Sequence, residues 1–301
     1  MIVVTGASGF IGSRLVDALR AGGTEVVGVD RRAAGHDDGR HLVAELSAPN
    51  DAVFEVLRRA DAVVHLAGKP GVRDRAADID AQRRRDNVLA TRAVLRAVPA
   101  ATPIVVASSS SVYGGAPNGR PSREDDVLAP GGGYALSKVR AENWCQRRRA
   151  EGGHVTIVRP FTVVGPGQRD DMALARWIAA AAAGRPLDVF GSLQRRRDFT
   201  DVRFTVSTLI ALLDHPPTVV NIGSGRSRPL ADLVDAIGDV IGEAVVRCRP
   251  VPVPEPDETL ADTHRLRSIV GDIPATDLRR IVADHVGVGV TSRATPEPLI
   301  A

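Results

Sequence analysis

Short apolar runs rich in β-branched residues alternate along the chain with longer segments whose apolar residues recur every three or four positions. The run IVVTG at 2–6 opens the pattern, and the residues that follow keep helical spacing until Gly22 and Gly23. A helix before Gly22 is therefore expected. The alternation continues to residue 160 and predicts further strands at 25–30, 41–46, 62–68, within 103–114 and at 154–160, with helices at 52–60, 81–98 and 134–150.

Strands that alternate with helices of this length are typical of parallel βαβ units. We expect an α/β fold with a doubly wound parallel sheet in residues 1–160 and a smaller, mainly substrate-binding lobe in 161–301. Proline and glycine become denser after residue 160, while 197–202 and 219–223 read as short strands. Segments at about 197–225 are expected to return to the first domain.

Composition excludes several classes of protein. The 301 residues are 44% hydrophobic and 25% charged, as in ordinary globular proteins, and 39 basic residues are interspersed with 36 acidic ones. The basic residues therefore form no concentrated patch of the kind that binds nucleic acid. The arginine runs at 83–85 and 147–149 are interpreted as solvated faces. Cys145 and Cys248 form neither a disulfide framework nor a metal-ligand cluster. No run is long enough to span a membrane, so we expect a cytoplasmic enzyme or binding protein.

The first chemical signal is the glycine triplet of TGASGFIG, residues 5–12. Gly6, Gly9 and Gly12 follow a predicted strand and open a predicted helix. Such glycines allow a tight turn, close approach of a pyrophosphate and close packing of the helix, whose free N–H groups attract the anion. The turn predicts a dinucleotide-binding Rossmann domain.

An acidic residue, Asp30, ends the second predicted strand about 20 residues further on, where it can accept hydrogen bonds from an adenosine ribose. Its charge favours NAD, because a 2′-phosphate would meet a carboxylate. Arg31 and Arg32 keep NADP open as the alternative, since either guanidinium suits a phosphate.

The segment YALSK, residues 134–138, combines two rare residue types. The chain has two tyrosines, and two lysines against 37 arginines, yet Tyr134 and Lys138 lie one helical turn apart on one face. A nearby ammonium, together with a nicotinamide ring, favours the phenolate, which then accepts a proton from a substrate hydroxyl. A surface pair without a role is the alternative interpretation. The serines of SSSSVYG, at the end of the preceding strand, lie at the sheet edge where ligands bind and favour catalysis.

With its G-x-x-G-x-x-G spacing and YALSK, the chain resembles the extended short-chain dehydrogenase/reductases, in particular the NAD-dependent epimerase/dehydratase family and its nucleotide-sugar 4-epimerases. The resemblance covers roughly residues 1–280. It rests on TGASGFIG, HLAG (65–68), DNVLATRAVL around Asn87, SSSSVYG (108–114), YALSK, RPFTVVGPGQ (159–168), GRPLDVFG (184–191), RRDFTDV (196–202) and NIGSG (221–225). KPGVR at 69–73 is similar to a segment of uronic-acid and UDP-sugar epimerases.

The resemblance implies catalytic residues Ser109, Tyr134 and Lys138, with Ser109 sharing the proton of the reacting oxygen. It also implies NAD as the cofactor. His65 is interpreted as a strand-end residue rather than an acid or base. The implied cofactor-binding residues are Gly6, Gly9, Phe10, Ile11, Gly12, Asp30, Arg31, Glu45, Leu46, Leu66, Ala67, Gly68, Asn87, Ser108, Tyr134, Lys138 and Pro160.

On the substrate side, the resemblance implies a nucleotide sugar held by Lys69, Ser110, Ser111, Thr162 and Arg197. Dehydratases of this family have Asp and Glu where this chain has Ser110 and Ser111, so a 4,6-dehydratase of that type is not expected. Thr162 replaces a family asparagine, and Pro254 replaces a family arginine that binds phosphate. Arg197 matches another phosphate-binding arginine, with an ion pair to Asp198 or Asp201 as the structural alternative.

Three functions compete at this point. The first is an NAD-dependent nucleotide-sugar epimerase acting at C4 through a keto sugar. The second is an NAD(P)-dependent reductase or dehydrogenase of a keto sugar or related carbonyl compound, which the missing phosphate ligands favour. The third is a non-catalytic dinucleotide-binding regulator. The helices at about 83–98 and 134–150 correspond to a dimer interface in the family, so we expect a homodimer.

Overall fold

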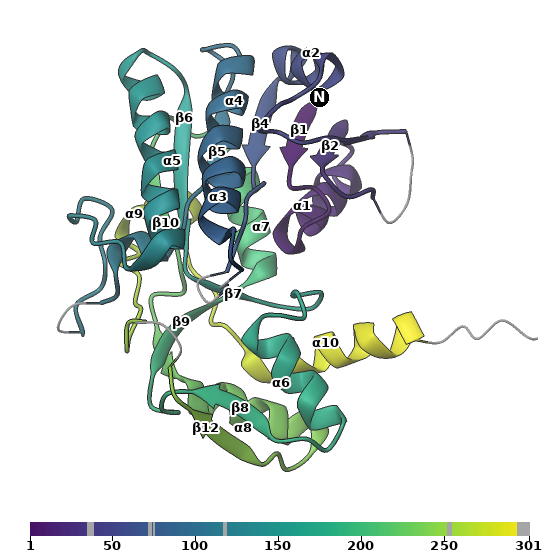
Figure 1. Cartoon of the computed structure of the whole chain (residues 1–301), viewed down its shortest axis with the longest axis vertical. Coiled ribbons are helices and arrows are strands. Elements are labelled where there is room, and N and C mark those ends of the chain that lie inside the picture. Colours follow the sequence, from purple (N-terminus) through teal and green to yellow (C-terminus); the bar gives the residue numbers. More distant parts are fainter. Residues whose placement is uncertain (35–38, 72–73, 75, 117–118, 252–254, 294–301) are drawn as a thin grey trace, which may run out of the picture.

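A seven-stranded parallel sheet forms the centre of the protein (Figure 1). The computed structural model describes residues 1–34, 39–71, 74, 76–116, 119–251 and 255–293. The strand order is β10-β6-β5-β4-β1-β2-β3, which confirms the predicted Rossmann sheet and adds a seventh strand. The strands are β1 (Ile2–Thr5), β2 (Val26–Asp30), β3 (His41–Val43), β4 (Ala62–His65), β5 (Ile104–Ala107), β6 (Val155–Pro160) and β10 (Val219–Ile222).

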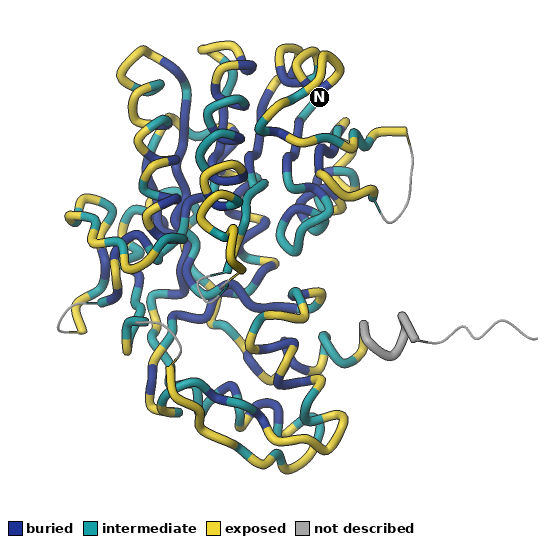
Figure 2. Tube along the Cα trace, viewed as in Figure 1, coloured by how far each residue is buried: buried dark blue, intermediate teal, exposed yellow. Residues whose placement is uncertain are grey.

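Helices cover both faces of this sheet, because successive strand residues point to opposite sides. Val4 and Val64 belong to one buried cluster, and their neighbours Val3 and Val63 belong to another. The first face carries α1 (Phe10–Ala21), α7 (Val202–Ala211) and α9 (His264–Val270). The second carries α2 (Asp51–Arg59), α4 (Ala90–Ala97) and α5 (Gly132–Ala150). In Figure 2 the strands of the sheet are dark blue, whereas the outer sides of the helices are yellow.

A second group of elements packs around its own hydrophobic cluster, below the sheet in Figure 1. The cluster joins Leu174, Leu187, Leu233 and Ile281, all nearly inaccessible to solvent. Its elements are α6 (Ala173–Ala182), β8 (Leu187–Phe190), α8 (Leu230–Ile241), β12 (Val246–Arg249) and α10 (Leu278–Arg293). This group lies within residues 161–301, where the sequence predicts a smaller lobe.

A separate three-stranded sheet shares no strand pairing with the central sheet. Its strands are β7 (Thr162–Val164), β9 (Arg196–Asp201) and β11 (Ser227–Pro229). The predicted strands at 197–202 and 219–223 therefore have different partners. The first is β9 of this small sheet, and the second is β10 at the edge of the main sheet. The division into domains at residue 160 remains a proposal.

The predicted helix at 81–98 consists of three segments. An α-helix α3 (Ile79–Arg83) is followed by a π-helix η1 (Arg84–Leu89) and then by α4. Short π-helical segments are often found at functional sites, because the extra residue in the turn redirects side chains. The predicted strand at 103–114 similarly ends at Ala107, and a 3₁₀ turn η2 (Ser110–Tyr113) follows it.

Candidate active site

The glycine turn between β1 and α1 lies directly against the end of β4. Gly6 has a φ of 73°, and a Cβ there would lie 2.7 Å from the backbone nitrogen of Ala67. A Cβ on Gly12 would lie 2.0 Å from the carbonyl oxygen of Gly6, so the first turn of α1 packs on the glycine turn itself. Gly9 is the N-cap and no side chain caps the helix. This arrangement fits the pyrophosphate of a dinucleotide, because the N–H groups at the helix start have no side-chain acceptor.

Other predicted cofactor-binding residues lie around the turn. Phe10 and Ile11 lie in the first turn of α1 and pack against the hydrophobic cluster of that face. Leu66, Ala67 and Gly68 follow β4, and the nitrogen of Leu66 donates to Thr5 of β1 at 3.0 Å. Their positions at the carboxyl ends of adjacent parallel strands are where dinucleotides bind in this fold.

Asp30 lies at the carboxyl end of β2 and is 8% exposed. Its carboxylate accepts hydrogen bonds from the nitrogen of Ser8 at 3.1 Å and from the nitrogen of Arg32 at 3.0 Å. The carboxylate is thereby held next to the glycine turn, where a ribose would lie. This observation fits the predicted role, in which Asp30 accepts hydrogen bonds from ribose hydroxyls.

The two arginines after Asp30 have protein partners. Arg31 pairs with Asp86 at 2.8 Å and with Glu45 at 3.4 Å, whereas Arg32 donates from Nη2 to the carbonyl of Ser8 at 2.7 Å. Arg31 is engaged by two carboxylates, one of which, Asp86, it shares with Arg85. Its guanidinium is therefore less available to a phosphate, which favours NAD over NADP. Glu45, which was expected to bind the cofactor, forms an ion pair with Arg31, and its contact with the cofactor remains a prediction.

Leu46, predicted to lie near the adenine, is 6% exposed and belongs to the hydrophobic cluster beneath β2. Its contact with the cofactor remains a prediction. Pro160, the last residue of β6, also keeps its predicted role as an expectation, at the same carboxyl edge of the sheet.

Tyr134 lies in the first turn of α5 and Ser109 is the N-cap of η2, immediately after β5. Ser109 Oγ accepts from the nitrogen of Ser111 at 3.2 Å, and its hydroxyl acts as a hydrogen-bond donor toward the phenol of Tyr134. Burial raises the pKa of Tyr134, while the Ser109 hydrogen bond and the charges of Arg169 and Arg83 act in the opposite direction. The structure thus brings Ser109 and Tyr134 together, as expected.

Lys138 lies one turn further along α5 and is 7% exposed. Its ammonium donates to the carbonyl of Ala107 at 2.9 Å and lies 3.4 Å from the position that a Cβ on Gly68 would take. Burial lowers the pKa of Lys138 to about 8, and nearby Cys145 and Glu142 oppose the shift. Lys138 therefore reaches the end of β4, between the glycine turn and the serine cluster.

Burial raises the pKa of Tyr134, and the opposing influences come from Ser109, Arg169 and Arg83. The expected lowering of that pKa by Lys138 together with a nicotinamide ring remains a prediction. Nζ of Lys138 itself donates to Ala107 at the end of β5.

The interpretation of the arginine run at 83–85 as a solvated face is wrong for Arg83, which is 6% exposed.

A buried polar network supports the catalytic helix from behind. Glu142, one turn after Lys138, pairs with Arg159 at 2.7 Å and accepts a hydrogen bond from the hydroxyl of Ser108. Arg159 also donates to the hydroxyl of Tyr113 at 2.8 Å, and that hydroxyl donates to Asn221 at 2.7 Å. Burial raises the pKa of Tyr113 to about 12. Ser108, expected at the cofactor, thus directs its hydroxyl toward this network, and its contact with NAD remains a prediction.

Asn87 connects the end of β4 with α5. Its Oδ1 accepts from the nitrogen of Lys69 at 2.7 Å, and its Nδ2 donates to the carbonyl of Lys69 at 3.1 Å and to Ser137 Oγ at 2.8 Å. Asn87 comes from η1 and is almost fully buried. It therefore holds the loop that carries Lys69 close to the helix that carries Tyr134 and Lys138.

The residues predicted to bind substrate occupy less uniform environments. Ser110 and Ser111 lie in η2 beside Ser109, and Ser111 Oγ is buried without a hydrogen-bond partner. Thr162 begins β7 opposite Phe199 of β9. The ammonium of Lys69 pairs with Asp74 at 2.9 Å. Of the predicted substrate ligands, the structure therefore places Ser110 and Ser111 directly beside Ser109.

Arg197, predicted to bind phosphate, is engaged by the chain that follows β12. Its guanidinium lies 3.5 Å from the carboxylate of Glu255 and donates to the carbonyl of Asp257 at 3.2 Å. The expected structural alternative is wrong, because Asp198 accepts from Ser224 and Asp201 pairs with Arg203 instead. Pro254, which replaces the other phosphate ligand, lies outside the described residues.

Arg83 and Arg169 are functional candidates that the sequence did not reveal. Both charges act on Tyr134 in the direction that favours the phenolate. Arg169 lies after β7 and pairs with Asp171 at 2.7 Å, and Arg83 ends α3. Within an arginine-rich sequence no residue type or spacing marks these two.

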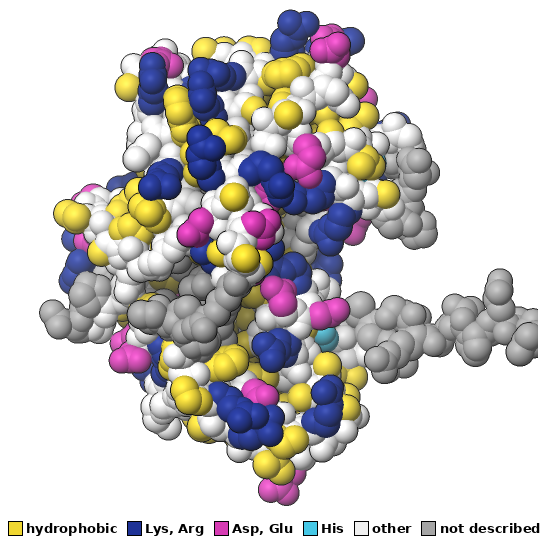
Figure 3. Space-filling model, in the orientation of Figure 1, with side chains coloured by type: hydrophobic (Ala, Val, Ile, Leu, Met, Phe, Trp, Pro, Cys, Tyr) yellow, Lys and Arg dark blue, Asp and Glu magenta, His cyan; other side chains and the backbone are white. Residues whose placement is uncertain are grey.

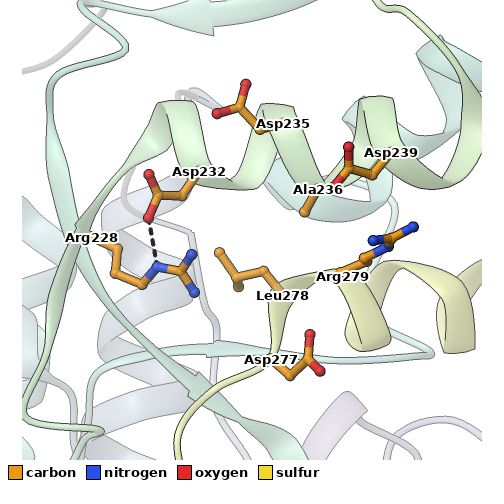
Figure 4. Close-up of a pocket in the computed structure, with 8 residues that line it drawn as sticks. All are labelled: Arg228, Asp232, Asp235, Ala236, Asp239, Asp277, Leu278 and Arg279. Carbon is orange, nitrogen blue, oxygen red and sulfur yellow. Dashed lines mark hydrogen bonds and ion pairs between the residues drawn. The ribbon is translucent and has the colours of Figure 1, made fainter.

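An open pocket of about 360 Å³ lies away from the catalytic residues, between α8 and the start of α10 (Figure 4). Asp232, Asp235 and Asp239 project from α8, and Arg228 pairs with Asp232 at 2.6 Å.

Within the described ranges no group of three or more histidine, cysteine and acidic residues is arranged to hold a metal ion. Figure 3 shows basic and acidic side chains interspersed over one face. Among the helices of the described residues, none combines the length and apolarity that crossing a bilayer requires.

Residues 2–223 match the NAD dependent epimerase/dehydratase family, and the chain belongs to it. It is an NAD-dependent enzyme of the extended short-chain dehydrogenase/reductase type. The family match and the parallel sheet confirm the resemblance stated from the sequence motifs. The glycine turn and Asp30 are the parts of the structure that fit its cofactor.

Similar proteins include several that act on nucleotide sugars. The chain is 31% identical to "Uncharacterized UDP-glucose epimerase YtcB" of Bacillus subtilis (strain 168) over 92% of this chain and 94% of that protein. MoeE5, solved in complex with UDP-glucose and NAD, has a TM-score of 0.87 and 34% identity, covering 97% of this chain and 99% of the other. UDP-glucuronic acid 4-epimerase from Bacillus cereus, solved with UDP-glucuronic acid and NAD, has a TM-score of 0.86 and 27% identity, covering 96% and 99%. Other similar proteins are named as a reductase and a dehydratase.

Proposed function

We propose that the protein is a nucleotide-sugar epimerase that inverts C4 of the sugar through a transient keto sugar, with NAD retained between turnovers. The observation that carries the proposal is the hydrogen bond between Ser109 and Tyr134, on the helix whose Lys138 reaches Ala107 and Gly68 at the carboxyl edge of the sheet. This is the edge at which ligands bind in open parallel sheets.

The residues of the chain supply the proton chemistry. Tyr134, as phenolate, accepts the proton of the sugar hydroxyl, and Ser109 donates a hydrogen bond to the same oxygen. When bound, NAD would supply the acceptance of hydride from C4 and, after the keto sugar has turned over, the return of that hydride to the opposite face, which inverts the centre. Lys138 holds the nicotinamide ribose in this proposal, because its ammonium lies between Gly68 and Ala107. The same Tyr134 then returns the proton, so the net reaction is redox-neutral.

The substrate class follows from the comparisons and from the serine turn. Similar proteins have been solved with UDP-glucose and UDP-glucuronic acid, which favours a UDP-sugar and position C4. Ser110 and Ser111 carry no carboxylate for the elimination of water, which argues against a 4,6-dehydratase. Lys69, Thr162 and Arg197 remain proposed substrate ligands, with Arg197 requiring release from Glu255 to reach a phosphate.

A reductase or dehydrogenase of a keto sugar is the alternative. The specific observation that favours it is the engagement of Arg197 by Glu255 and Asp257, since a nucleotide diphosphate then lacks its expected ligand. The pairing of Arg31 with two carboxylates argues against an exchangeable NADP.

One experiment separates the two functions. The purified protein is denatured, the released nucleotide is identified by chromatography, and UDP-glucose and UDP-glucuronic acid are tested for conversion to their C4 epimers. Stoichiometric NAD with epimer formation and no net change in absorbance at the NADH band supports the epimerase. A protein that releases no nucleotide and consumes NADH or NADPH in proportion to product is a reductase instead.

We further propose a homodimer formed through α4 and α5, as expected from the sequence. The stacking of Arg92 on Trp144, with 4.9 Å between guanidinium carbon and ring centroid, joins these two helices to each other. A cytoplasmic location is also proposed, because the exposed thiol of Cys248 is free, which suits a reducing compartment. Sedimentation at micromolar concentration tests the dimer.

A further inference from the structure

Arg83 is a buried cation next to the catalytic helix. Its Nη2 donates to the carbonyl of Gly71 at 2.9 Å and to the carbonyl of Asp74 at 3.4 Å, both in the segment that follows β4. Its Nη1 donates to Asp80 at 3.2 Å, but that carboxylate is 84% exposed. An exposed partner compensates a buried charge only weakly, so the two loop carbonyls hold the guanidinium in place.

The position of Arg83 repeats that of Asn87 one helical turn earlier. Asn87 binds the backbone of Lys69 on one side and Ser137 of α5 on the other. Arg83 binds Gly71 on one side and lies against Gly133 of α5 on the other. These two cross-links, from α3 and from η1, both join the segment after β4 to α5 at positions four residues apart. Each contacts the residue just before a catalytic one, Gly133 before Tyr134 and Ser137 before Lys138.

The ends of the Arg83 and Asp80 side chains occupy the space that a Cβ on Gly133 would take. A Cβ there would lie 2.6 Å from Asp80 Oδ1 and 2.8 Å from Arg83 Nη1. The residue lies inside α5 and its φ is not positive, so its conformation alone does not demand glycine. The glycine therefore allows the guanidinium to approach the backbone that carries Tyr134.

We propose that Arg83 is a positioning residue for catalysis, which fixes Gly71 and Asp74 against the first turn of α5 and holds a positive charge beside Tyr134. The proposal rests on the proposed function only where it takes Tyr134 as the proton acceptor. Arg83 itself touches neither the sugar nor the cofactor in this proposal. It acts through the placement and the charge state of Tyr134.

The charge environment of Tyr134 comes from several elements. Arg83 is one of two guanidinium groups that favour its phenolate, and Ser109 contributes a hydrogen bond. Both guanidinium groups are themselves paired with carboxylates, Arg83 with Asp80 and Arg169 with Asp171. The groups that a pH-dependent test must consider are Ser109 of η2, Arg169 with Asp171 after β7, Lys69 with Asp74 after β4, Asp80 with Arg83 on α3, and Lys138 on α5 itself.

A titration of Tyr134 tests the proposal directly, without substrate. The chain has two tyrosines, so protein labelled with ¹³Cζ-tyrosine gives two signals, and Tyr113→Phe assigns them. In Arg83→Met the pKa of Tyr134 should be higher than in the unsubstituted protein, because a nearby positive charge is lost. In Arg83→Lys, which keeps the charge but not the bidentate geometry, that pKa should stay closer to the original value.

Turnover provides the second reading. Epimerisation of UDP-glucose or UDP-glucuronic acid should fall in kcat by about 10- to 100-fold in both variants, since small displacements of a catalytic group have effects of this size. Arg84→Met is the matched control, because Arg84 is the exposed neighbour in the same segment. An unchanged Tyr134 titration in Arg83→Met, equal to that in Arg84→Met, would overturn the proposal.

One further variant and the unsubstituted protein keep the result interpretable. If Arg83→Met does not fold, Gly133→Ala displaces the guanidinium from the other side while Arg83 remains present, and it should also raise the pKa of Tyr134. An unchanged titration in Gly133→Ala would then refute the positioning role. If the unsubstituted protein converts no nucleotide sugar, the proposed function fails, yet the titration still decides whether Arg83 sets the state of Tyr134.

Discussion

Arg159 donates from Nη2 to Oε2 of Glu142 at 2.7 Å, and neither side chain is more than 5% exposed. The pair joins the end of β6 to the middle of α5, one turn after Lys138. Glu142 also opposes the lowering of the Lys138 pKa by burial. A charge buried in this way is stable only while its partner is present.

Glu142→Ala should therefore lower the free energy of unfolding by about 3–5 kcal/mol, because it leaves the guanidinium of Arg159 buried without its carboxylate. Urea unfolding followed by circular dichroism measures the change. Glu55→Ala is the control: Glu55 pairs with Arg58 at 2.9 Å on the surface, so its loss should cost less than about 1 kcal/mol. Equal changes in the free energy of unfolding would show that the buried pair stabilises the fold no more than the surface pair does.

The two tyrosines should separate stability from catalysis. Tyr134→Phe removes the proposed proton acceptor and should lower kcat for UDP-glucose or UDP-glucuronic acid by about 10²- to 10⁴-fold, with little change in unfolding. Tyr113→Phe removes a buried hydroxyl that bonds Arg159 and Asn221, and should cost about 1–3 kcal/mol of stability while turnover persists. Full turnover in Tyr134→Phe would contradict the assignment of the acid–base residue.

The apolar pattern was sufficient to predict the sheet, because strands buried on both faces appear as uninterrupted β-branched runs. It was not sufficient for the helix at 81–98. A π-helical segment such as η1 adds one residue to a turn without changing which residue types are apolar. The spacing of apolar residues therefore could not predict that the Asn87 side chain is directed toward Ser137.

Short motifs revealed the site where its residues are close in sequence, as with Tyr134 and Lys138. They did not reveal contacts between distant segments. Arg197 was predicted from a motif around β9, but its partners Glu255 and Asp257 come from a segment nearly 60 residues later. Arg83 was one of three consecutive arginines, and only the packing of α3 on α5 distinguishes it from its neighbours.

Asp30 provides a test of the cofactor site that does not need a substrate. Asp30→Ala removes a charged acceptor for ribose hydroxyls, and hydrogen bonds to charged groups contribute about 1.5–3 kcal/mol. The Kd for NADH, measured by fluorescence, should therefore rise by about 10- to 100-fold. Asp17→Ala, at an exposed position on α1, should leave the Kd unchanged. A similar Kd in both variants would remove Asp30 from the cofactor site.

His65 should make the fold sensitive to acid. Thr91 donates its hydroxyl to the carbonyl of Asn87, so it accepts from Nε2 of His65, and Nδ1 then accepts from Thr5 at 2.7 Å. The ring is therefore neutral in the fold, and burial with the charge of Lys138 lowers the pKa of His65 to about 3.

Because the folded pKa lies below the unfolded value of about 6.5, the contribution of His65 is fully present above pH 6.5 and is lost as the pH falls toward 3. At pH 5 the loss should be about 2 kcal/mol relative to pH 7, at 1.36 kcal/mol for each pH unit. His65→Asn should reduce the difference in unfolding free energy between pH 7 and pH 5 by about this amount, as measured in urea. His264→Asn, at an exposed position, is the control. If His65→Asn keeps the full pH dependence, other groups cause the acid sensitivity and the neutral ring does not.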